Sequence, residues 1–563
     1  MSDWIVKFGL AGVQDFIGQA RKVRDFAAGS KLVSGMMHAA LTTAGREDVE
    51  ILLPATDGSA DHIPQQLLLL VKDKTPEEVK VFGLELEAAA AEWISRNADD
   101  LAAKQASTHF KEAIHGQFAA AFAKYWAAVT VESASSGPDT YDRDAAAWNK
   151  LSGAFDARKH SRTFPQLPDI AGRACSLCGV RPFVHEVTKT GEYLCAVCLG
   201  KRLWGQSNLA RKFPSTRRIA ASRRFHRLVG NDLQQAEDIF EELDDLGPGT
   251  PSTEPQKAML ESIRTLSPYY AMVVFDGDNM GKWMGGVRFT TRDNFWKQQS
   301  ALSSALLHFA KEAHTVAFKY GARVVYTGGD DGLMLCPLDR VLPLTAALHA
   351  AWNCCVQNEL RGAMPNQVGF PTFSLHLSLL HEKEPLQAAV DELHHLLHAA
   401  KEEEGRDCFS ILAKSGGGAP VCMRGKWAEF DGLVKLVEAI ANWRHADEIC
   451  PDKAELDRRA AEQLSSRLPH TIIECTEVFF GPDGRLGVGM KPTLEMELAR
   501  LAGKSEAGAK RSGMAPHTAW LGERAAEVNP GKNRAFLRDL GFHRMSSALS
   551  VAAFLARQVE WRD

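Results

Sequence analysis

The sequence predicts an α+β protein built from several domains. Between residues 271 and 412, short apolar segments typical of buried strands alternate with longer segments that carry apolar residues at helical spacing. This alternation is typical of one sheet with helices packed on it. At roughly 150 residues per domain, the 563-residue length corresponds to about three to four domains. Clusters of turn-forming residues at 247–251 and 415–418 mark a break on each side of the alternating region.

Composition excludes several protein classes. With 66 Lys and Arg against 70 Asp and Glu, the net charge of −4 gives no global attraction to nucleic acid or to anionic membranes. No apolar run approaches the roughly 18 residues of a membrane span, and the N-terminus lacks the pattern of a signal peptide. The 11 cysteines are an odd number and most are scattered, which fits a reducing compartment better than a disulfide framework. We therefore expect a cytoplasmic globular protein.

The first 160 residues combine short strands with long alanine-rich helices. Three apolar runs, at 5–8, 51–53 and 67–71, are predicted strands. Ala, Leu and Glu at helical spacing predict two or more helices over 76–127. The polar residues 133–144 predict a loop.

The alternating region predicts five strands and three helices in order. The predicted strands are 271–275, 323–327, 332–336, 372–380 and 408–412. The predicted helices are 293–319, 340–360 and 385–402. The remainder of the chain is predicted to be mostly helical, with a loop at 502–514.

Four cysteines form a pattern with metal-ligand spacing. Cys175 and Cys178 make one CxxC pair, and Cys195 and Cys198 make a second pair sixteen residues later. Each two-residue gap lets two thiolates at a tight turn reach one ion, and two such turns complete a closed tetrahedral S4 site for Zn²⁺. The alternatives are four buried thiols or a redox pair. Closed ligation predicts a structural zinc, not a catalytic one.

The strongest catalytic signal is an acidic turn between two apolar runs. Gly328, Gly329, Asp330 and Asp331 separate the strands predicted at 323–327 and 332–336, so the carboxylates are expected at a hairpin tip. Adjacent carboxylates with no protein cation nearby are costly to fold together unless a divalent cation neutralises them. The alternative is a surface turn chosen for turn propensity.

A second acidic segment strengthens this prediction. The buried strand 271–275 ends at Asp276 and Asp278, and carboxylates at the end of a sheet strand lie where α/β folds bind ligands. Such an Asp beside an acidic hairpin tip would hold two Mg²⁺ ions about 4 Å apart, one activating a 3′-hydroxyl and one stabilising the leaving pyrophosphate. Backbone N–H groups between Asn279 and Lys282 would bind a triphosphate at a helix N-terminus.

These motifs occur with others in a specific order. The further matching segments are 12–17, 20–25, 28–31, 213–216, 219–220, 372–374, 381–386 and 400–401. With the CxxC pairs, 276–282 and 328–331, the sequence resembles the large palm-domain subunit of type III CRISPR RNA-guided effector complexes, Cmr type (III-B).

The resemblance implies a domain plan. It implies two ferredoxin-like palm domains, the second with the GGDD hairpin, a zinc-bearing segment between them and a helical C-terminal domain. On this sequence the plan assigns 1–160 to a first palm-like domain with a helical insertion, 161–255 to the zinc-binding and helical domain, 256–420 to the catalytic palm and 421–563 to the helical domain.

The resemblance also implies an activity and its partners. The activity is synthesis of cyclic oligoadenylates from ATP when a guide CRISPR RNA pairs with target RNA, within a complex of other protein subunits. Asp276, Asp330 and Asp331 would be catalytic and hold Mg²⁺ or Mn²⁺. The nucleotide-binding residues would be Gly277, Asp278, Asn279, Gly281, Lys282, Gly328, Gly329 and Lys401.

The sequence departs from the fullest form of this family. Many members begin with a metal-dependent HD nuclease domain, but none of the 19 histidines here is followed by Asp, and Asp61–His62 has the reverse order. We therefore expect no DNase activity. The first palm is expected to be catalytically vacant, because the position analogous to Asp276, near Phe8–Gly9–Leu10, carries no carboxylate.

A concentrated basic run precedes the palm. Seven cations fall within residues 211–227 without an acid among them, and aromatic residues are interleaved. This pattern fits contact with a phosphate backbone, for which the candidates are Arg217, Arg218, Arg223 and Arg224. The alternative is a solvated helix face paired with the acidic run 237–245.

Two other functions remain open from the sequence. A cyclic-dinucleotide synthase would use a similar acidic Gly-Gly turn and would be separated by its choice of GTP over ATP. A scaffold that binds guide and target RNA with a silent palm is the alternative from a different class.

Overall fold

The computed structural model describes most of the chain. The described residues are 2–55, 58, 63–105, 107–131, 138–160, 173–188, 191–209, 213–221, 239, 253–264, 267–292, 294–415, 419–441, 468–481, 484–505, 515–526 and 542–559. Within these ranges, no helix is both long enough and apolar enough to cross a membrane.

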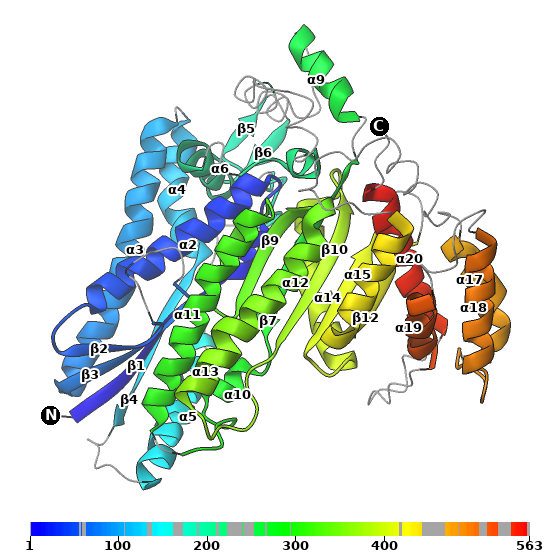
Figure 1. The fold of residues 1–563 in the computed structure, drawn as a ribbon. Coiled ribbons are helices and arrows are strands. Elements are labelled where there is room, and N and C mark those ends of the chain that lie inside the picture. The colour runs from blue at the N-terminus through cyan, green and yellow to red at the C-terminus, as the bar shows by residue number, and fades with distance from the viewer. Residues whose placement is uncertain are drawn as a thin grey trace.

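The N-terminal part forms a four-stranded antiparallel sheet with helices on both faces (Figure 1, blue to cyan). The strands are β1 (Ser2–Ala11), β2 (Val49–Leu53), β3 (Gln66–Lys74) and β4 (Ala123–Val131), in the order β2-β3-β1-β4. The helices are α1 (Val13–Gly18), α2 (Val23–Ala44), α3 (Pro76–Lys104), α4 (Thr108–Ala121) and α5 (Pro138–His160). With α1–α2 between β1 and β2, and α3–α4 between β3 and β4, this is the βαββαβ topology of a ferredoxin-like fold.

The central part forms a six-stranded sheet whose first four strands repeat that topology (Figure 1, green). The strands are β7 (Tyr269–Gly277), β8 (Arg323–Thr327), β9 (Asp331–Pro337), β10 (Phe373–His381), β11 (Cys408–Ala413) and β12 (Val421–Lys426), in the order β12-β11-β10-β7-β9-β8. The helical segments are α10 (Met280–Met284), α11 (Phe295–Lys319), the 3₁₀ turn Leu338–Arg340, α12 (Val341–Trp352), a π-helical stretch Asn353–Asn358, α13 (Glu359–Ala363) and α14 (Leu386–Glu403).

Both faces of the central sheet are buried, which explains why β7 is apolar along its length. Ala271, Val273 and Phe275 join a core that includes side chains of α11 and α12. The alternate residues, Tyr270, Met272 and Val274, join a second core shared with the first sheet and its helices. Because successive strand residues point to opposite faces, α11 and α12 cover one face of the central sheet, and α14 together with the N-terminal part covers the other.

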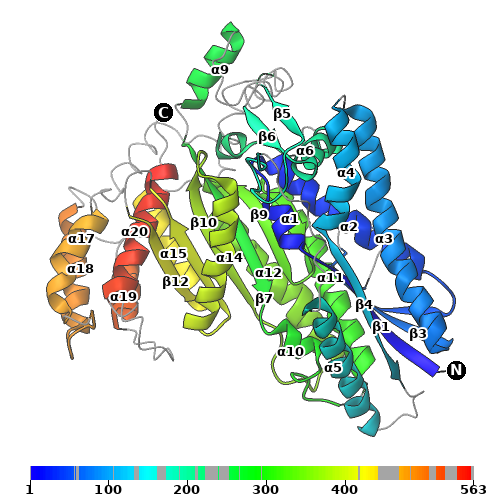
Figure 2. The same ribbon diagram turned by 180° about the vertical axis from the view of Figure 1, so that it is seen from behind.

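The remaining elements lie at two ends of the molecule (Figures 1 and 2). The cysteine-bearing segment contains β5 (His185–Val187), β6 (Glu192–Leu194) and α6 (Ala196–Asn208), and α6 contacts α2, α3 and α4. Helix α9 (Glu254–Arg264) follows it. The C-terminal helices are α15 (Trp427–Ala441), α17 (Leu468–Thr476), α18 (Lys491–Ser505), α19 (Ala515–Ala526) and α20 (Phe542–Val559), with a 3₁₀ turn at Glu477–Phe479. Helix α20 contacts β11 and β12.

The structure confirms the α+β class and most of the predicted elements. Strands β8, β10 and β11 and helix α11 follow the predicted bounds closely. Two predictions are wrong: residues 123–127, predicted as helix, lie in β4, and residues 138–144, predicted as loop, begin α5. The predicted break at 415–418 is followed by a strand, β12, which pairs with β11 across residue 420. The domain boundaries stay a prediction.

Candidate functional site

Two of the predicted carboxylates are direct neighbours on adjacent strands. In the antiparallel pairing of β7 with β9, Asp276 lies opposite Asp331, and the Gly277 N–H donates to the Asp330 carbonyl at 2.9 Å. Residues directly opposite each other have Cβ atoms about 4.5–5.5 Å apart and project from the same face. Like charges in that position repel each other. The strand register that pairs Asp276 with Asp331 therefore favours a cation between them.

The two glycines before the carboxylates let the backbone of the turn lie close to the Asp331 side chain. Residues Gly328–Asp330 connect β8 to β9, and the Gly328 N–H donates to the Asp331 carbonyl at 2.8 Å. A Cβ on Gly328 would lie 2.1 Å from Asp331 Oδ1, so a side chain there would displace the Asp331 carboxylate. Gly329 has φ +104°, a conformation that favours glycine. The Gly-Gly pair therefore brings the backbone against the carboxylate that follows it.

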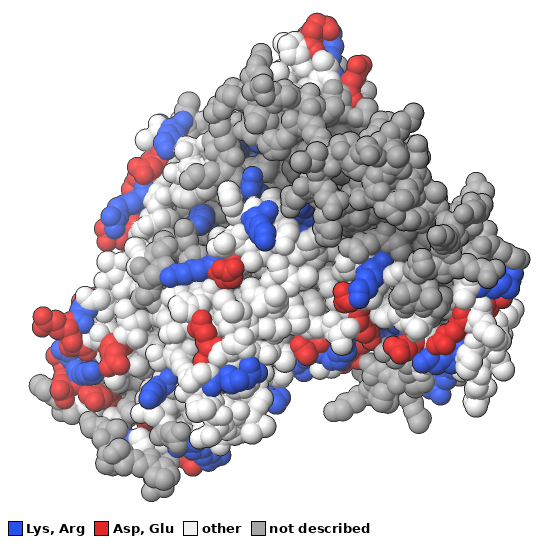
Figure 3. All heavy atoms as spheres, viewed as in Figure 1, with Lys and Arg blue, Asp and Glu red and all other residues white. Residues whose placement is uncertain are grey.

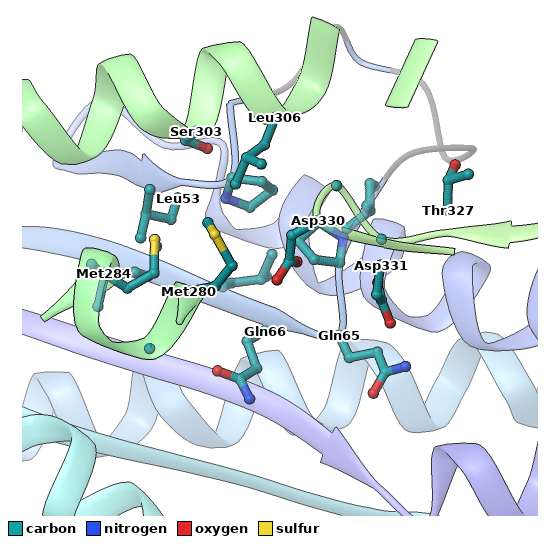
Figure 4. Close-up of a pocket in the computed structure, with 18 of the residues that line it drawn as sticks. Leu53, Gln65, Gln66, Met280, Met284, Ser303, Leu306, Thr327, Asp330 and Asp331 are labelled. Atoms are coloured by element: carbon teal, nitrogen blue, oxygen red, sulfur yellow. The ribbon is translucent and has the colours of Figure 1, made fainter. Parts of the chain in front are cut away.

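The acidic residues open into a cavity of about 670 Å³ between the two sheets. The central part contributes Asp276, Met280, Gly281 and the turn 327–331, and the N-terminal part contributes residues from β1, β3, α2 and α5. In Figure 4, Asp330 and Asp331 project from the turn on one side, while Gln65 and Gln66 lie below them on the other. The volume is in the range of small-molecule sites.

Removal from bulk water and mutual repulsion shift the proton affinities of this cluster. Burial raises the pKa of Asp330 to about 8, and the charges of Asp331 and Asp276 act in the same direction. Burial and the Asp276 charge raise the pKa of Asp331 to about 6. Carboxylates that hold protons this strongly are of the chemical type that a divalent cation neutralises. The ligand oxygens of Asp276, Asp330 and Asp331 do not all lie within 4.8 Å of one another, so the set fits Mg²⁺ or Mn²⁺ by its chemistry and not by a closed ligand geometry.

The structure corrects one premise of the sequence argument, because a protein cation does lie near the cluster. Lys401 on α14 forms an ion pair with Asp276 Oδ2 and donates to the Asp276 carbonyl at 3.1 Å. Its charge also lowers the pKa of both Asp330 and Asp331, against the larger effects of burial and repulsion. Lys401 thus contacts the predicted site through its ion pair with Asp276, but it does not line the cavity.

Asp278 does not present its carboxylate to the cavity. Its side chain is fully buried and accepts hydrogen bonds from the Thr372 and Ser374 hydroxyls and the Asp407 backbone N–H. The structure therefore places it behind the strand end, where it ties β7 to β10 and to the turn before β11. The prediction that its carboxylate binds nucleotide does not match this placement.

The segment after β7 is shorter than a nucleotide-binding helix. Helix α10 has five residues, and its N-cap, Asn279, is left-handed with φ +58°. Gly281 lines the cavity, whereas Asn279 and Lys282 do not. A role for these backbone N–H groups in binding a triphosphate stays a prediction.

The N-terminal sheet carries an uncharged counterpart of the acidic pair. In the equivalent pairing of β1 with β3, Gly9 lies opposite Gln66, and the Leu10 N–H donates to the Gln65 carbonyl at 3.3 Å. Gln65 and Gln66 thus occupy the positions that Asp330 and Asp331 occupy in the central sheet. The described strands of the first sheet therefore place no carboxylate there, as expected from the sequence.

Sequence reasoning missed this second wall of the cavity. Besides the glutamines, it includes Lys7 on β1, whose ammonium lies 4.8 Å from the centre of the Phe155 ring. Burial lowers the pKa of Lys7. No local sequence motif marks these residues. They could have been found only by aligning the two β-α-β repeats with each other in three dimensions.

The four predicted cysteines come together in the cysteine-bearing segment. Their Sγ atoms all lie within 4.8 Å of one another, and the Cys178–Cys195 pair is 3.8 Å apart. Four ligands about 2.3 Å from one Zn²⁺ lie about 3.8 Å from each other in a tetrahedron, so the thiols fit a metal such as zinc. Within the described ranges this is the one group of three or more such residues found.

The cysteine-bearing segment is anchored to helices α1 and α2 by buried polar contacts. Lys201, on the helix after the second CxxC pair, donates to the carbonyls of Phe16 and Gln19, each at 2.5 Å. Arg202 pairs with Asp25 at 3.2 Å and with Glu192 at 2.6 Å, and all three are buried. The metal-ligand turns are thereby fixed against α1 and α2.

The basic run is only partly described. Arg223 and Arg224, and the acidic run 237–245 except residue 239, lie outside the described residues. Arg217 forms an ion pair at 3.3 Å with Glu382, which follows β10, so its charge is partly neutralised within the protein. On the face shown in Figure 3, Lys and Arg are intermixed with Asp and Glu. Contact with RNA by Arg217, Arg218, Arg223 and Arg224 stays a prediction.

Comparison with known proteins matches both sheets. Residues 269–410 match the family model of the second palm domain of Cas10/Cmr2, and residues 5–122 match that of the N-terminal region of the CRISPR-associated protein Cmr2. Two separate stretches of the chain are therefore similar to Cas10/Cmr2 proteins. Over 173 residues it is 30% identical to the CRISPR system Cmr subunit Cmr2 of Pyrococcus furiosus; this covers 26% of the chain and 19% of that protein.

Solved structures share the fold of this chain over nearly its full length. The apo state of type III-B Cmr-beta matches with a TM-score of 0.63 at 13% identity, covering 98% of this chain and 81% of the other. Cmr-beta bound to cognate target RNA matches with a TM-score of 0.61 at 13% identity, covering 99% and 83%. A Csm1–Csm4 cassette in complex with pppApA matches with a TM-score of 0.50 at 14% identity, covering 98% and 69%.

Proposed function

We propose that this chain is the large subunit of a type III CRISPR RNA-guided effector and that its central palm converts ATP into cyclic oligoadenylates. The observation that carries the proposal is the pairing of Asp276 opposite Asp331 inside the matched palm domain, at the wall of a cavity. The pppApA and pppApApA complexes of similar folds support adenylate as the substrate class. The match to Cmr-beta bound to cognate target RNA supports guide and target RNA and other subunits as partners.

The residues of the cavity have distinct tasks in this proposal. Asp276, Asp330 and Asp331 would hold Mg²⁺ or Mn²⁺, and the Gly277 carbonyl is available beside them. When bound, such ions neutralise phosphate charge and favour ionisation of the attacking hydroxyl. Gly328 and Gly329 would let the backbone approach the nucleotide. The reaction is attack of a ribose 3′-hydroxyl on an α-phosphate with pyrophosphate leaving in line.

Product analysis with labelled nucleotides tests the proposal. We would incubate the full chain, alone and within its RNA-loaded complex, with ATP or GTP and Mg²⁺ or Mn²⁺, and identify products by mass. Cyclic oligoadenylates that disappear in the Asp330→Ala, Asp331→Ala variant are the expected result. Cyclic dinucleotides from GTP would indicate the other synthase class, and RNA binding without any product would indicate a scaffold. Absence of DNase activity stays a prediction.

A further inference from the structure

Asp278 is a buried carboxylate that accepts more hydrogen bonds than the end of a strand requires. Its side chain has no exposed area. The Thr372 hydroxyl donates to Oδ2 at 2.8 Å, the Ser374 hydroxyl donates to Oδ1 at 2.9 Å, and the Asp407 N–H donates to Oδ2 at 2.9 Å. Three donors and the Lys401 ammonium surround this carboxylate, which lies directly behind the acidic cluster.

Lys401 connects this buried carboxylate to the cavity. Its Nζ lies 3.3 Å from Asp278 Oδ1 and also forms the ion pair with Asp276 Oδ2. The Lys401 side chain is 10% exposed, whereas the Asp276 side chain is 43% exposed. One ammonium is therefore shared between a buried carboxylate and the carboxylate that faces the cavity.

The backbone next to this pair is held in an unusual conformation. Gly405, Arg406 and Asp407 have φ values of +78°, +67° and +51°, so three successive residues are left-handed. Non-glycine residues adopt this conformation at a cost, and it persists where surrounding contacts fix it. The contacts here are Asp407 N–H to Asp278 and Arg406 N–H to the Lys401 carbonyl at 3.1 Å.

A second buried ion pair holds the same turn from the other side. Arg544 of α20 contacts both carboxylate oxygens of Glu404, at 2.9 and 3.2 Å, and both residues are buried. Glu404 lies three residues after Lys401 at the end of α14. The position of Lys401 is thus fixed by the sheet through Asp278 and by the C-terminal helices through Glu404.

We propose that Asp278 and Lys401 are a positioning pair in which Asp278 holds the Lys401 ammonium beside Asp276 and so sets how strongly Asp276 binds a divalent cation. The inference rests on the proposed role of Asp276 as a metal ligand. The Lys401 charge opposes an incoming cation at Asp276. The Asp278 carboxylate, 3.3 Å from the same ammonium, offsets part of that opposing field.

The two charges make opposite predictions, which a purely structural role does not. Replacing Lys401→Met removes the opposing charge, so the affinity for Mn²⁺ should rise about five-fold. Replacing Asp278→Asn removes the offsetting charge, so the affinity should fall about five-fold. The double variant should return to within about two-fold of the original chain, because both charges are gone.

The experiment is a titration of the full chain with Mn²⁺ alone, followed by the EPR signal of free Mn²⁺. Lys414→Met is the matched control, because Lys414 also pairs with two carboxylates, Glu384 at 3.0 Å and Glu392 at 2.6 Å, but does not contact Asp276. It should leave the Mn²⁺ affinity unchanged. Lys401→Arg retains the charge and should remain within about two-fold of the original affinity.

The outcomes separate this inference from the proposed function. If both single variants weaken Mn²⁺ binding and the double variant is weakest, or if the chain binds no Mn²⁺, the positioning pair is wrong. If oligoadenylate forms but Asp278→Asn binds Mn²⁺ as tightly as the original chain, the pair is wrong and the function stands. If the opposed pattern appears without any oligoadenylate, the pair stands and the function is wrong.

Discussion

The two palm sheets have the same strand order but different residues at the same structural position. In the central sheet, Asp276 on the first strand faces Asp331 on the third. In the N-terminal sheet, Gly9 faces Gln66. Both sheets also share a main-chain hydrogen bond from the end of the first strand to the residue before the third. In the central sheet the Gly277 N–H donates to the Asp330 carbonyl, and in the N-terminal sheet the Leu10 N–H donates to the Gln65 carbonyl.

This difference shows that the fold supplies the position and the side chains supply the chemistry. Glutamine amides have the reach of a carboxylate but no charge, so the N-terminal pair has neither the repulsion nor the raised pKa of Asp330 and Asp331. Both pairs line one cavity. The charged pair opposite a neutral pair makes the two sides of the cavity differ in charge, and the proposed function places the metal ions on the charged side.

The largest effect should come from neutralising the charged pair. The Asp330→Asn, Asp331→Asn variant keeps the shape of the turn but removes the metal-binding charge, so formation of oligoadenylate from ATP should fall at least about a thousand-fold. The matched change in the other sheet, Gln65→Ala with Gln66→Ala, should cost less than about ten-fold. Rates measured under saturating ATP would test both. Equal losses would mean that the two sheets contribute catalytic groups alike.

Zinc removal should affect the N-terminal sheet more than the central one. We expect about one Zn²⁺ per chain. A strong chelator should accelerate amide exchange at least about ten-fold in α6, α1 and α2, because Lys201 anchors α6 to the carbonyls of Phe16 and Gln19. Exchange in β7 and β9 should remain slow. Cys175→Ser should reproduce the effect, and Cys354→Ser, at an exposed thiol, should not. Equal acceleration of amide exchange in both sheets would contradict the prediction that zinc mainly stabilises the N-terminal part.

The charged pair should also make stability depend on pH, which the glutamine pair cannot do. An Asp in the unfolded chain releases its proton near pH 4, whereas the pKa values of Asp330 and Asp331 are raised to about 8 and about 6. The folded chain therefore binds more protons over that range, so its free energy of unfolding falls as pH rises from about 4 to 8.

Thermal melts without added divalent ions would measure this dependence. The melting temperature should fall by several degrees between pH 5 and pH 8 (roughly the span set by the two pKa values), and Mg²⁺ should restore it more at the higher pH. Asp330→Asn should flatten the profile. A melting temperature that does not fall with pH in this window would show that the folded chain does not hold protons on these two carboxylates.

The sequence predicted the central sheet better than the N-terminal one, for physical reasons. Strand β7 is buried on both faces and reads as a continuous apolar run, and the turn 328–331 carries its own chemistry. Strand β4 begins with an alanine-rich stretch after a helix, and only its pairing with β1 defines it. The roles of Lys401 and Asp278 depend on contacts across more than 90 positions, for which spacing gives no signal.

The smallest effect should come from adding a charge to the neutral pair. Gln66→Glu places one carboxylate on the opposite wall of the cavity, where it would repel nucleotide phosphates without contacting the metal-binding pair. We expect the KM for ATP to rise about two- to five-fold, less at high salt, with kcat retained. Gln66→Met, which removes the amide without adding charge, is the control. A fall in kcat as large as that of Asp331→Asn would mean that Gln66 contacts the reacting atoms, and the two sheets would then differ in charge but not in role.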